Sequence, residues 1–309
     1  MTRSSARLHG KRNGNLRLLI TGASGLLGSK LATHAIDAGH EVYSIYSTHM
    51  PSAGNPQRMD ITDEAAVNTE VARKSPDVVI HCAALTDVDL CERNPELAMR
   101  VNSLATRFLG EACEKIGSFL TYVSTDYVFD GAQGHYSEGD KPNPINTYGR
   151  SKVSGEQQLL HSGSDFCIAR TSVVYGWGRE HRPNFAAWIY SRLSARQNVN
   201  VVTDQYASPT LNSHLARMLL EVAERRLRGT YHLAGSTRAS RYQFAILLAR
   251  RYGFDENLLI PVGAESVNWT AKRPPDSSLN VGKAREMLNN KPITIAESLE
   301  QFAREAPHP

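Results

Sequence analysis

The alternation of apolar and polar positions divides the first 170 residues into short apolar runs separated by helix-length segments. Each run is almost continuously apolar, which is typical of parallel strands buried on both faces. Strands are predicted at 16–21, 41–46, 77–83, 119–125 and 166–170. Helices are predicted at 26–38, 63–74, 96–116 and 147–161. This order predicts an α/β fold, a doubly wound parallel sheet of the Rossmann type with right-handed crossovers.

The pattern becomes less regular after residue 170. Helical segments are predicted at 184–196, 212–226, 240–252 and 294–305, and apolar runs lie at 199–203, 229–234 and 258–262. We therefore expect a Rossmann domain at 16–170 and a smaller, mainly substrate-binding α/β cap at 171–309, with segments of about 200–235 returning to the first sheet. The polar, basic residues 1–15 predict a flexible tail.

Composition narrows the class of protein. The 309 residues are 41% hydrophobic and 21% charged, as in soluble globular proteins. The net charge of +4 comes without a basic, aromatic-rich cluster, which argues against nucleic acid, and no long apolar run predicts a membrane span. The cysteines form no CxxC pair, which favours the cytoplasm and no structural metal. They are Cys82, Cys91, Cys113 and Cys167.

A glycine-rich segment, "TGASGLLG", follows the first apolar run. Its glycines, Gly22, Gly25 and Gly28, permit a tight turn and bring backbone N–H groups close to a pyrophosphate at a helix N-terminus. The position of the segment between a strand and a helix predicts a dinucleotide site. The residues expected to contact the cofactor here are Gly22, Ser24, Gly25, Leu26, Leu27 and Gly28.

The end of the second predicted strand bears on the choice of cofactor. It reads "YSTHM", without the Asp or Glu that commonly binds the adenosine ribose of NAD. The hydroxyls of Ser47 and Thr48 would tolerate a 2′-phosphate, so NADPH is favoured and NADH stays open. Asp60 and Ile61 are expected near the adenine. The segment "CAAL" contains two small residues, Ala83 and Ala84, beside which the cofactor could lie closely. Packing in the core explains the small size of these residues equally well.

Three residues form a candidate catalytic set. Thr125 ends the fourth predicted strand, where open α/β sheets bind ligands, and Tyr148 and Lys152 lie four residues apart on one face of a predicted helix. Reduction of a ketone needs a hydride on carbon and a proton on oxygen. A phenol with a pKa near ~10 can give that proton if a nearby ammonium lowers the pKa. Thr125 would hold the carbonyl oxygen.

A series of segments resembles the extended short-chain dehydrogenase/reductase superfamily over nearly the whole chain, and within it the dTDP-4-dehydrorhamnose reductase family. The segments are "TGASGLLG", "HCAALTDVDLCE", "STDYVFDG", "NPINTYGRSKVSGE", "ARTSVVYG", "TDQYASPT" and "KRPPDSSLN". The resemblance implies NAD(P)H-dependent reduction of the 4-keto group of dTDP-4-dehydro-6-deoxy-L-mannose to dTDP-L-rhamnose. It implies that Thr125, Tyr148 and Lys152 are catalytic, with the last two also touching the cofactor. The implied substrate contacts are Thr86, Val88, Tyr127, Asn184, Gln205 and Arg273.

The resemblance has further consequences. Asn102 is similar to an asparagine that supports the active site in the superfamily. Tyr127 stands where related dehydratases carry a glutamate, which argues against dehydration, and Val173 stands where rhamnose-pathway reductases often carry Trp. A homodimer through the helices at 96–116 and 147–161 is typical of the superfamily. No carboxylate cluster predicts a metal site.

Two alternatives stay open. The chain also resembles the β subunit of methionine adenosyltransferase in "YVFDG" and in its nucleotide loop. That resemblance implies a non-catalytic, NADP-binding regulatory subunit with a catalytic partner. The second alternative is another nucleotide-sugar 4-ketoreductase or an epimerase. An epimerase keeps NAD⁺ tightly bound, so the missing ribose carboxylate favours a reductase.

Overall fold

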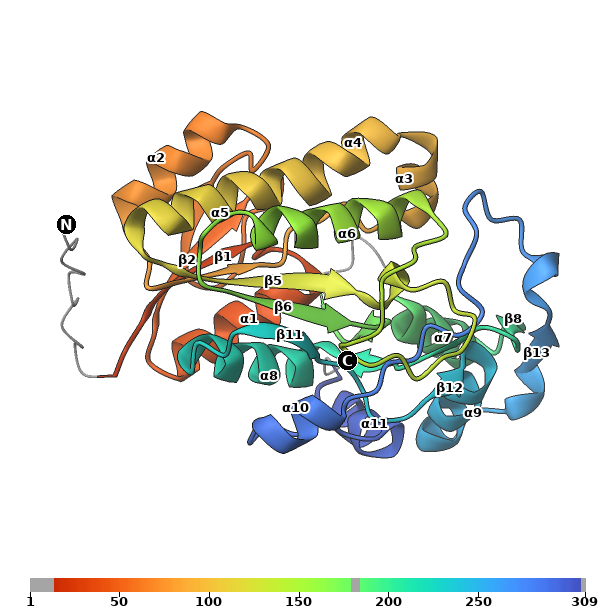
Figure 1. The fold of residues 1–309 in the computed structure, drawn as a ribbon. Helices are drawn as coiled ribbons and strands as arrows, with labels where there is room; N and C mark the ends of the chain where they lie inside the picture. The colour runs from red at the N-terminus through yellow and green to blue at the C-terminus, as the bar shows by residue number, and fades with distance from the viewer. Residues whose placement is uncertain (1–13, 179–183, 307–309) are drawn as a thin grey trace, which may run out of the picture.

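The computed structural model describes residues 14–178 and 184–306, and its centre is a seven-stranded parallel sheet (Figure 1). The order is β11-β6-β5-β4-β1-β2-β3. The strands are β1 (Arg17–Thr21), β2 (Glu41–Tyr46), β3 (Asn55–Arg58), β4 (Val78–His81), β5 (Phe119–Thr125), β6 (Phe166–Thr171) and β11 (Gly229–His232). The predicted doubly wound α/β class is confirmed. The hydrophobic pattern missed β3, because this exposed edge strand reads "NPQR".

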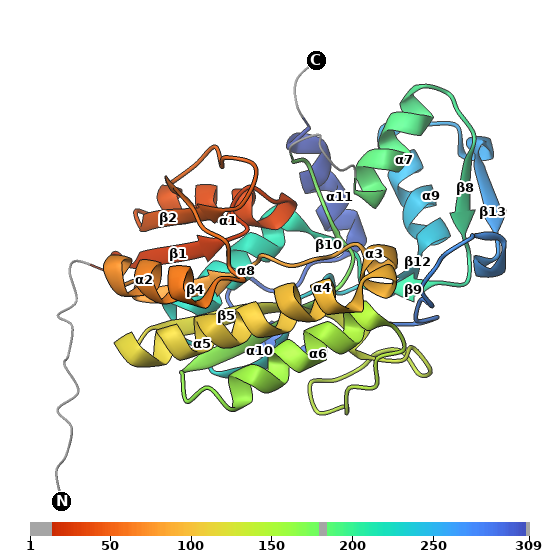
Figure 2. The ribbon, with the colours of Figure 1, turned by 90° about the horizontal axis from the view of Figure 1, so that it is seen from above.

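Helices cover both faces of the sheet (Figures 1 and 2). One face carries α1 (Leu26–Asp37) and α8 (Asn212–Glu224), and the other carries α2 (Glu64–Lys74), α5 (Ala105–Ile116) and α6 (Thr147–Leu160). Successive side chains of β1 point to opposite faces of the sheet. Leu18 and Ile20 pack with Leu31 of α1 on one face, and Leu19 packs with Phe108 of α5 on the other. Both faces are buried, which explains why the strands read as continuous apolar runs.

The predicted helix at 96–116 is interrupted in the structure. A short helix, α3 (Val88–Arg93), comes first, and α4 (Pro95–Met99) runs into a π-helical turn, η1 (Arg100–Leu104), before α5 begins. Asn94 caps α4 by accepting a hydrogen bond from the Leu97 N–H at 3.1 Å. The π turn places Asn102 in the interior with no exposed surface. Such turns inside helices are frequent at functional sites.

The second half of the chain builds a smaller lobe beyond the carboxyl ends of β5 and β6 (Figures 1 and 2). Its helices are α7 (Phe185–Ser194), α9 (Arg241–Tyr252) and α11 (Ile295–Arg304), with 3₁₀ turns η3 (Glu256–Leu258) and η4 (Ala264–Ser266). Its paired strands are β7 (Val174–Tyr175) with β10 (Thr210–Leu211), β8 (Val199–Val202) with β13 (Leu259–Val262), and β9 (Tyr206–Ala207) with β12 (Ala239–Ser240). Ile189, Phe244 and Phe302 lie in its core.

Three elements from the second half lie against the first sheet. Strand β11 pairs in parallel with β6, so that Gly229 lies opposite Cys167, and α8 packs against α1. Helix α10 (Gly282–Met287) packs against β11. Strand β8 stays in the smaller lobe with β13. A hydrogen bond at 2.9 Å from the Asn212 Nδ2 to the Leu26 carbonyl joins α8 to the start of α1. The two halves therefore share one continuous packing interface.

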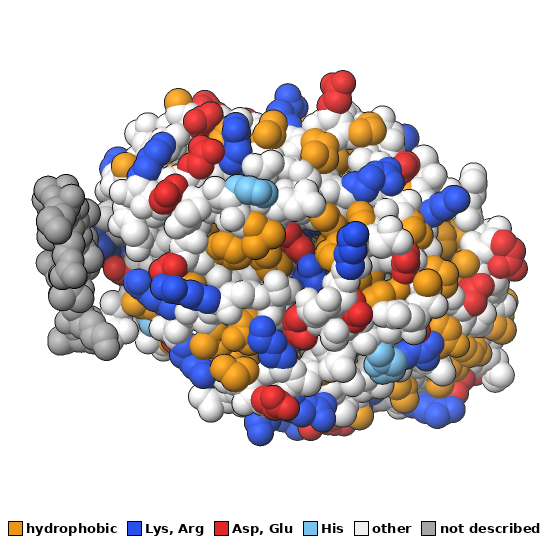
Figure 3. Space-filling model, viewed as in Figure 1, with side chains coloured by type: hydrophobic (Ala, Val, Ile, Leu, Met, Phe, Trp, Pro, Cys, Tyr) orange, Lys and Arg blue, Asp and Glu red, His pale blue; other side chains and the backbone are white. Residues whose placement is uncertain are grey.

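The surface in Figure 3 carries Lys and Arg side chains interspersed with Asp and Glu side chains rather than a basic region. No helix within 14–178 and 184–306 has the length and apolar character needed to cross a membrane. Over the same residues, no group of three or more His, Cys, Asp or Glu side chains could hold a metal ion. All four cysteines are free thiols. The predicted tail falls outside the described residues except for residues 14 and 15.

Candidate active site

The structure brings Thr125 and Tyr148 together at the carboxyl end of β5. Thr125 ends the strand and caps the 3₁₀ turn η2 (Asp126–Val128), because its Oγ1 accepts a hydrogen bond from the Tyr127 N–H at 3.2 Å. Asn146 caps α6 by accepting from the Gly149 N–H at 2.8 Å, which places Tyr148 in the first turn. The Thr125 hydroxyl is near enough to the Tyr148 phenol to lower the pKa of that phenol. The Tyr148 ring also meets the Tyr127 ring edge-on, with centroids 6.0 Å apart.

Lys152 lies one turn further along α6 and is almost completely buried, with 1% of its surface exposed. Its ammonium donates a hydrogen bond to the Val123 carbonyl at 2.8 Å and lies 4.1 Å from the centre of the Tyr122 ring. Burial lowers the pKa of Lys152 to about 7, although the Glu156 carboxylate opposes this shift. A buried lysine without a direct carboxylate partner is costly, and such groups cluster at functional sites.

The surroundings of Tyr148 favour the neutral phenol. Burial raises its pKa above the usual value, and the nearby Thr125 hydroxyl lowers it by a smaller amount. A protonated phenol at the edge of a sheet suits a proton donor. Burial is the largest influence on the pKa of Tyr148. The expectation that the Lys152 ammonium lowers this pKa therefore stays a prediction.

A buried carboxylate, Asp126, connects Thr125 to the second half of the chain. It accepts hydrogen bonds from the hydroxyls of Thr125 at 3.0 Å, Ser172 at 2.7 Å and Ser277 at 2.5 Å. Burial raises the pKa of Asp126, whereas the three hydroxyls lower it. The supporting role of Asp126 could not be predicted from the sequence, because Ser277 is 151 residues away along the chain.

Asn102 anchors the opposite side of α6. Its Nδ2 donates to the Ser151 hydroxyl at 2.9 Å and to the Leu85 carbonyl at 3.0 Å, and its Oδ1 accepts from the Leu85 N–H at 2.8 Å. The Tyr122 hydroxyl donates to the Asn102 carbonyl at 3.1 Å. Every polar group of this side chain is therefore engaged. Asn102 fixes the segment after β4 against the helix that carries Tyr148.

A buried ion pair holds α6 against β6. Arg170 binds Glu156 through two hydrogen bonds of 3.0 and 2.7 Å, and the Ser124 hydroxyl donates to the same carboxylate at 2.6 Å. Both charged side chains are only 6% exposed. Removing one partner of such a pair leaves the other charge buried without compensation.

Arg170→Ala is expected to lower the free energy of unfolding by about 3–5 kcal/mol, because Glu156 would remain buried and unpaired. Chemical denaturation measures this change. The matched control is Arg228→Ala, which removes a 2.6 Å pair with Asp165 whose side chains are 70% and 53% exposed. That exposed pair is expected to contribute no more than about 1 kcal/mol. Equal losses in the two variants would contradict the structural role of the buried pair.

The glycine-rich segment forms a cradle next to β4. Gly22 adopts a left-handed backbone (φ +68°), and a Cβ there would lie 2.8 Å from the Ala83 nitrogen. A Cβ on Gly28 would lie 2.2 Å from the Gly22 carbonyl oxygen. Helix α1 begins at Leu26, with Gly25 at its N-cap. The glycine backbone, which carries no side chains, and the N-terminus of α1 suit the binding of a dinucleotide pyrophosphate.

The other residues predicted to contact the cofactor lie along the same edge of the sheet. The Ala23 N–H donates to the Ile45 carbonyl at 3.1 Å, which joins the glycine segment to the end of β2. Ser47 and Thr48 follow β2 and are exposed. Two hydrogen bonds from Thr62 lower the pKa of Asp60, which is exposed. The remaining predicted positions are Ser24, Leu26, Leu27, Ile61, Ala83 and Ala84, all partly buried.

A chain of polar side chains leads from the second lobe to Tyr127. The Gln205 Nε2 donates to the Tyr127 hydroxyl at 3.2 Å, and the Arg241 Nε donates to the Gln205 Oε1 at 3.2 Å. The Arg241 guanidinium also lies 4.8 Å from the Phe185 ring centre. The positive charges of Arg241 and Arg273 both lower the pKa of the buried Tyr127, but burial raises it more. No sequence motif surrounds Arg241, so its place in this chain of side chains could not be predicted.

The remaining predicted substrate contacts have different surroundings. Arg273 pairs with Asp89 at 3.0 Å and lies 5.3 Å from the Trp269 ring centre. Asn184 caps α7 and donates to the Gly176 carbonyl at 2.7 Å, so its amide is engaged locally. Thr86 is exposed after β4, and Val88 begins α3. Contact of these residues with a substrate stays a prediction.

Val173 has an unusual backbone for a β-branched residue, with φ of +40°. It follows Ser172, which binds Asp126, and its carbonyl accepts a hydrogen bond from the Thr210 N–H at 3.1 Å. Left-handed backbone at such a residue is strained and persists only where the surrounding structure fixes it. The backbone of Val173 is therefore fixed next to the hydroxyls that bind Asp126.

The parallel sheet, the glycine cradle and the Thr125, Tyr148 and Lys152 set define a protein of the extended short-chain dehydrogenase/reductase class. The comparisons are more specific. The chain belongs to the family described as RmlD substrate binding domain, whose model matches residues 16–307. The resemblance found in the sequence segments is thereby confirmed.

Similar proteins carry several names. The dTDP-4-dehydrorhamnose reductase of Mycobacterium tuberculosis is 36% identical over 272 residues, 85% of this chain and 84% of that protein. Methionine adenosyltransferase 2 subunit beta of Xenopus tropicalis is 31% identical over 278 residues, 88% of this chain and 82% of that protein. A crystal structure of dTDP-4-dehydrorhamnose reductase from Bacillus anthracis in complex with NADP has a TM-score of 0.86 and 32% identity, covering 94% of this chain and 100% of that chain.

Proposed function

We propose that this protein is an NAD(P)H-dependent oxidoreductase that reduces the 4-keto group of dTDP-4-dehydro-6-deoxy-L-mannose to give dTDP-L-rhamnose. The observation that carries the proposal is the placement of Tyr148, in the first turn of α6, beside Thr125 at the carboxyl end of β5, with the buried Lys152 ammonium one turn further along the helix. The family match over residues 16–307 and the relatives named dTDP-4-dehydrorhamnose reductase support it.

Each residue of the set has a distinct role in this proposal. Tyr148 donates a proton to the oxygen of the ketone as it becomes an alkoxide. Thr125 positions that oxygen by donating its hydroxyl proton to it, for which the hydroxyl turns away from Asp126, its acceptor in this structure. Lys152 supplies positive charge beneath Tyr148 and stabilises the phenolate that remains. The bound nicotinamide supplies the hydride.

The two parts of the chain divide the binding work in the proposed enzyme. Residues 16–170 would hold the dinucleotide and the catalytic set, and residues 171–309 would mainly hold the nucleotide sugar. Arg241 and Arg273, which approach Tyr127 from the second half, suit the diphosphate of such a substrate because guanidinium groups bind phosphate bidentately. The four free thiols support a cytoplasmic enzyme, and α5 and α6 supply the surface of a proposed homodimer.

The test is oxidation of NADPH and NADH by the purified protein with dTDP-4-dehydrorhamnose, with identification of the sugar product. Turnover that yields dTDP-rhamnose is expected. The likeness to methionine adenosyltransferase 2 subunit beta makes a binding role the second candidate. Cofactor binding without turnover, together with co-purification of a methionine adenosyltransferase, would favour that role instead. Turnover of another 4-keto sugar nucleotide would keep the chemistry and change the substrate.

A further inference from the structure

The strand that the hydrophobic pattern missed brings an arginine to the edge of the dinucleotide site. Arg58 ends β3 and lies opposite Tyr46, the last residue of β2. Its Nε donates a hydrogen bond to the Ser47 carbonyl at 3.1 Å. The run "YSTHM" after β2 contains no arginine, but the neighbouring strand supplies one.

Arg58 lies within reach of a cofactor that rests on the glycine segment. Strand β2 separates β3 from β1, and neighbouring strands lie ~4.8 Å apart, so β3 lies about 10 Å from the end of β1. The Ala23 N–H contact with Ile45 joins the glycine segment to β2 on the same edge. An adenosine ribose that extends from the pyrophosphate across β2 would therefore present its 2′ position to Ser47, Thr48 and Arg58.

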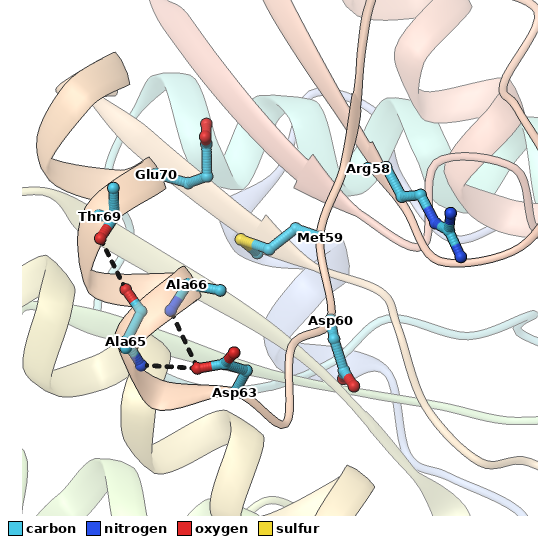
Figure 4. A pocket seen from close by; sticks show the side chains of 8 residues that line it. All are labelled: Arg58, Met59, Asp60, Asp63, Ala65, Ala66, Thr69 and Glu70. Atoms are coloured by element: carbon cyan, nitrogen blue, oxygen red, sulfur yellow. Dashed lines mark hydrogen bonds between the residues drawn. The ribbon is translucent and has the colours of Figure 1, made fainter.

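The surroundings leave the Arg58 guanidinium available to an anion. The side chain is exposed, and Arg58 forms no ion pair with a carboxylate in the part of the chain that the structure describes. Figure 4 shows Met59 pointing toward α2, whereas Arg58 points to the other side of the segment, away from Asp63 and Glu70. Asp60 shares this edge, but Thr62 holds its carboxylate through two hydrogen bonds.

We propose that Arg58 binds the 2′-phosphate of NADPH and makes the protein selective for NADPH over NADH. The Nε contact with Ser47 orients the guanidinium, and the hydroxyls of Ser47 and Thr48 complete a cradle for the phosphate. Arginine suits this role because its planar fork matches a phosphate. The inference rests on the NAD(P)H dependence of the proposed function, but it concerns cofactor binding and does not depend on the identity of the sugar.

The test is calorimetric titration of the full-length protein with NADPH and with NADH. The wild type is expected to bind NADPH more tightly than NADH, by about 10- to 100-fold, as for a charged hydrogen-bonded contact. Arg58→Gln is expected to remove most of this difference by weakening NADPH binding, with the dissociation constant for NADH unchanged within about twofold. Added salt should reduce the wild-type difference, because the contact is exposed.

The control is Arg73→Gln, which removes another exposed arginine near the same segment. Arg73 pairs with Glu70 at 2.6 Å and also binds Gln57 at 3.0 Å, so its guanidinium is engaged on α2. This variant should leave both affinities unchanged. Equal binding of NADPH and NADH by the wild type, or an equal loss of both in Arg58→Gln, would overturn the proposal. The absence of sugar turnover would leave this result intact and would count only against the proposed reaction.

Discussion

Tyr148→Phe is expected to lower kcat with dTDP-4-dehydrorhamnose by about 10²–10⁴-fold, the usual contribution of a positioned general acid. The substitution removes the hydroxyl proposed to protonate the alkoxide and keeps the ring that packs against Tyr127. Burial keeps the phenol protonated by raising its pKa, so the loss should persist across neutral pH rather than reflect a shifted titration. Steady-state oxidation of NADPH measures the effect.

Two measurements separate this chemical role from a structural one. The dissociation constant for NADPH and the melting temperature should change little in Tyr148→Phe. Tyr43→Phe serves as the control, because its hydroxyl bonds the surface carboxylate of Glu41, and it should retain wild-type kcat. A Tyr148→Phe enzyme that keeps more than about a tenth of wild-type kcat would show that another group donates the proton.

The parts of the fold that could be predicted are those in which local pattern and tertiary environment agree. Continuous apolar runs predicted the strands that are buried on both faces, such as β1 and β4. The exposed edge strand β3 carries no such pattern. The π turn at 100–104 was also invisible, because its residues continue the amphipathic pattern of the helices on either side. The division into domains stays a prediction.

For the side chains of the candidate site, too, only the contacts within one local element could be predicted from the sequence. Tyr148 and Lys152 could be paired from sequence because a helix brings residues four apart onto one face. Asp126, Arg241 and Arg58 gain their significance only from partners on other elements. Ser277, for example, meets Asp126 across 151 residues. No local pattern reports such contacts, so the supporting groups required the structure.

Lys152→Met is expected to lower activity and raise stability together. Its ammonium is buried against the Val123 carbonyl and the Tyr122 ring, so a side chain of similar length without charge should pack there at lower cost. We expect the free energy of unfolding at pH 7 to increase by about 1–2 kcal/mol. The value of kcat should fall at least about 100-fold, because the Tyr148 phenolate loses its stabilising charge.

The pH dependence of stability gives the sharper test of Lys152. Burial lowers its pKa from 10.5 to about 7 in the folded protein, so the unfolded chain binds the additional proton between these values. The contribution of Lys152 to the free energy of unfolding must therefore rise with pH above about 7. Lys152→Met should remove this rise, whereas Lys115→Met, which removes a surface ammonium bonded to Asn68, should keep it. Chemical denaturation at several pH values measures both.

Activity should show the opposite trend, because the same deprotonation removes the charge that Tyr148 uses. In the wild type, kcat/KM for NADPH, which reports the free enzyme, is expected to decline as pH rises through about 7. A rise in stability and a decline in kcat/KM over the same pH range would assign both to the Lys152 ammonium. If Lys152→Met is less stable than the wild type at every pH, the buried ammonium contributes to folding, and its interaction with Val123 and Tyr122 outweighs its desolvation.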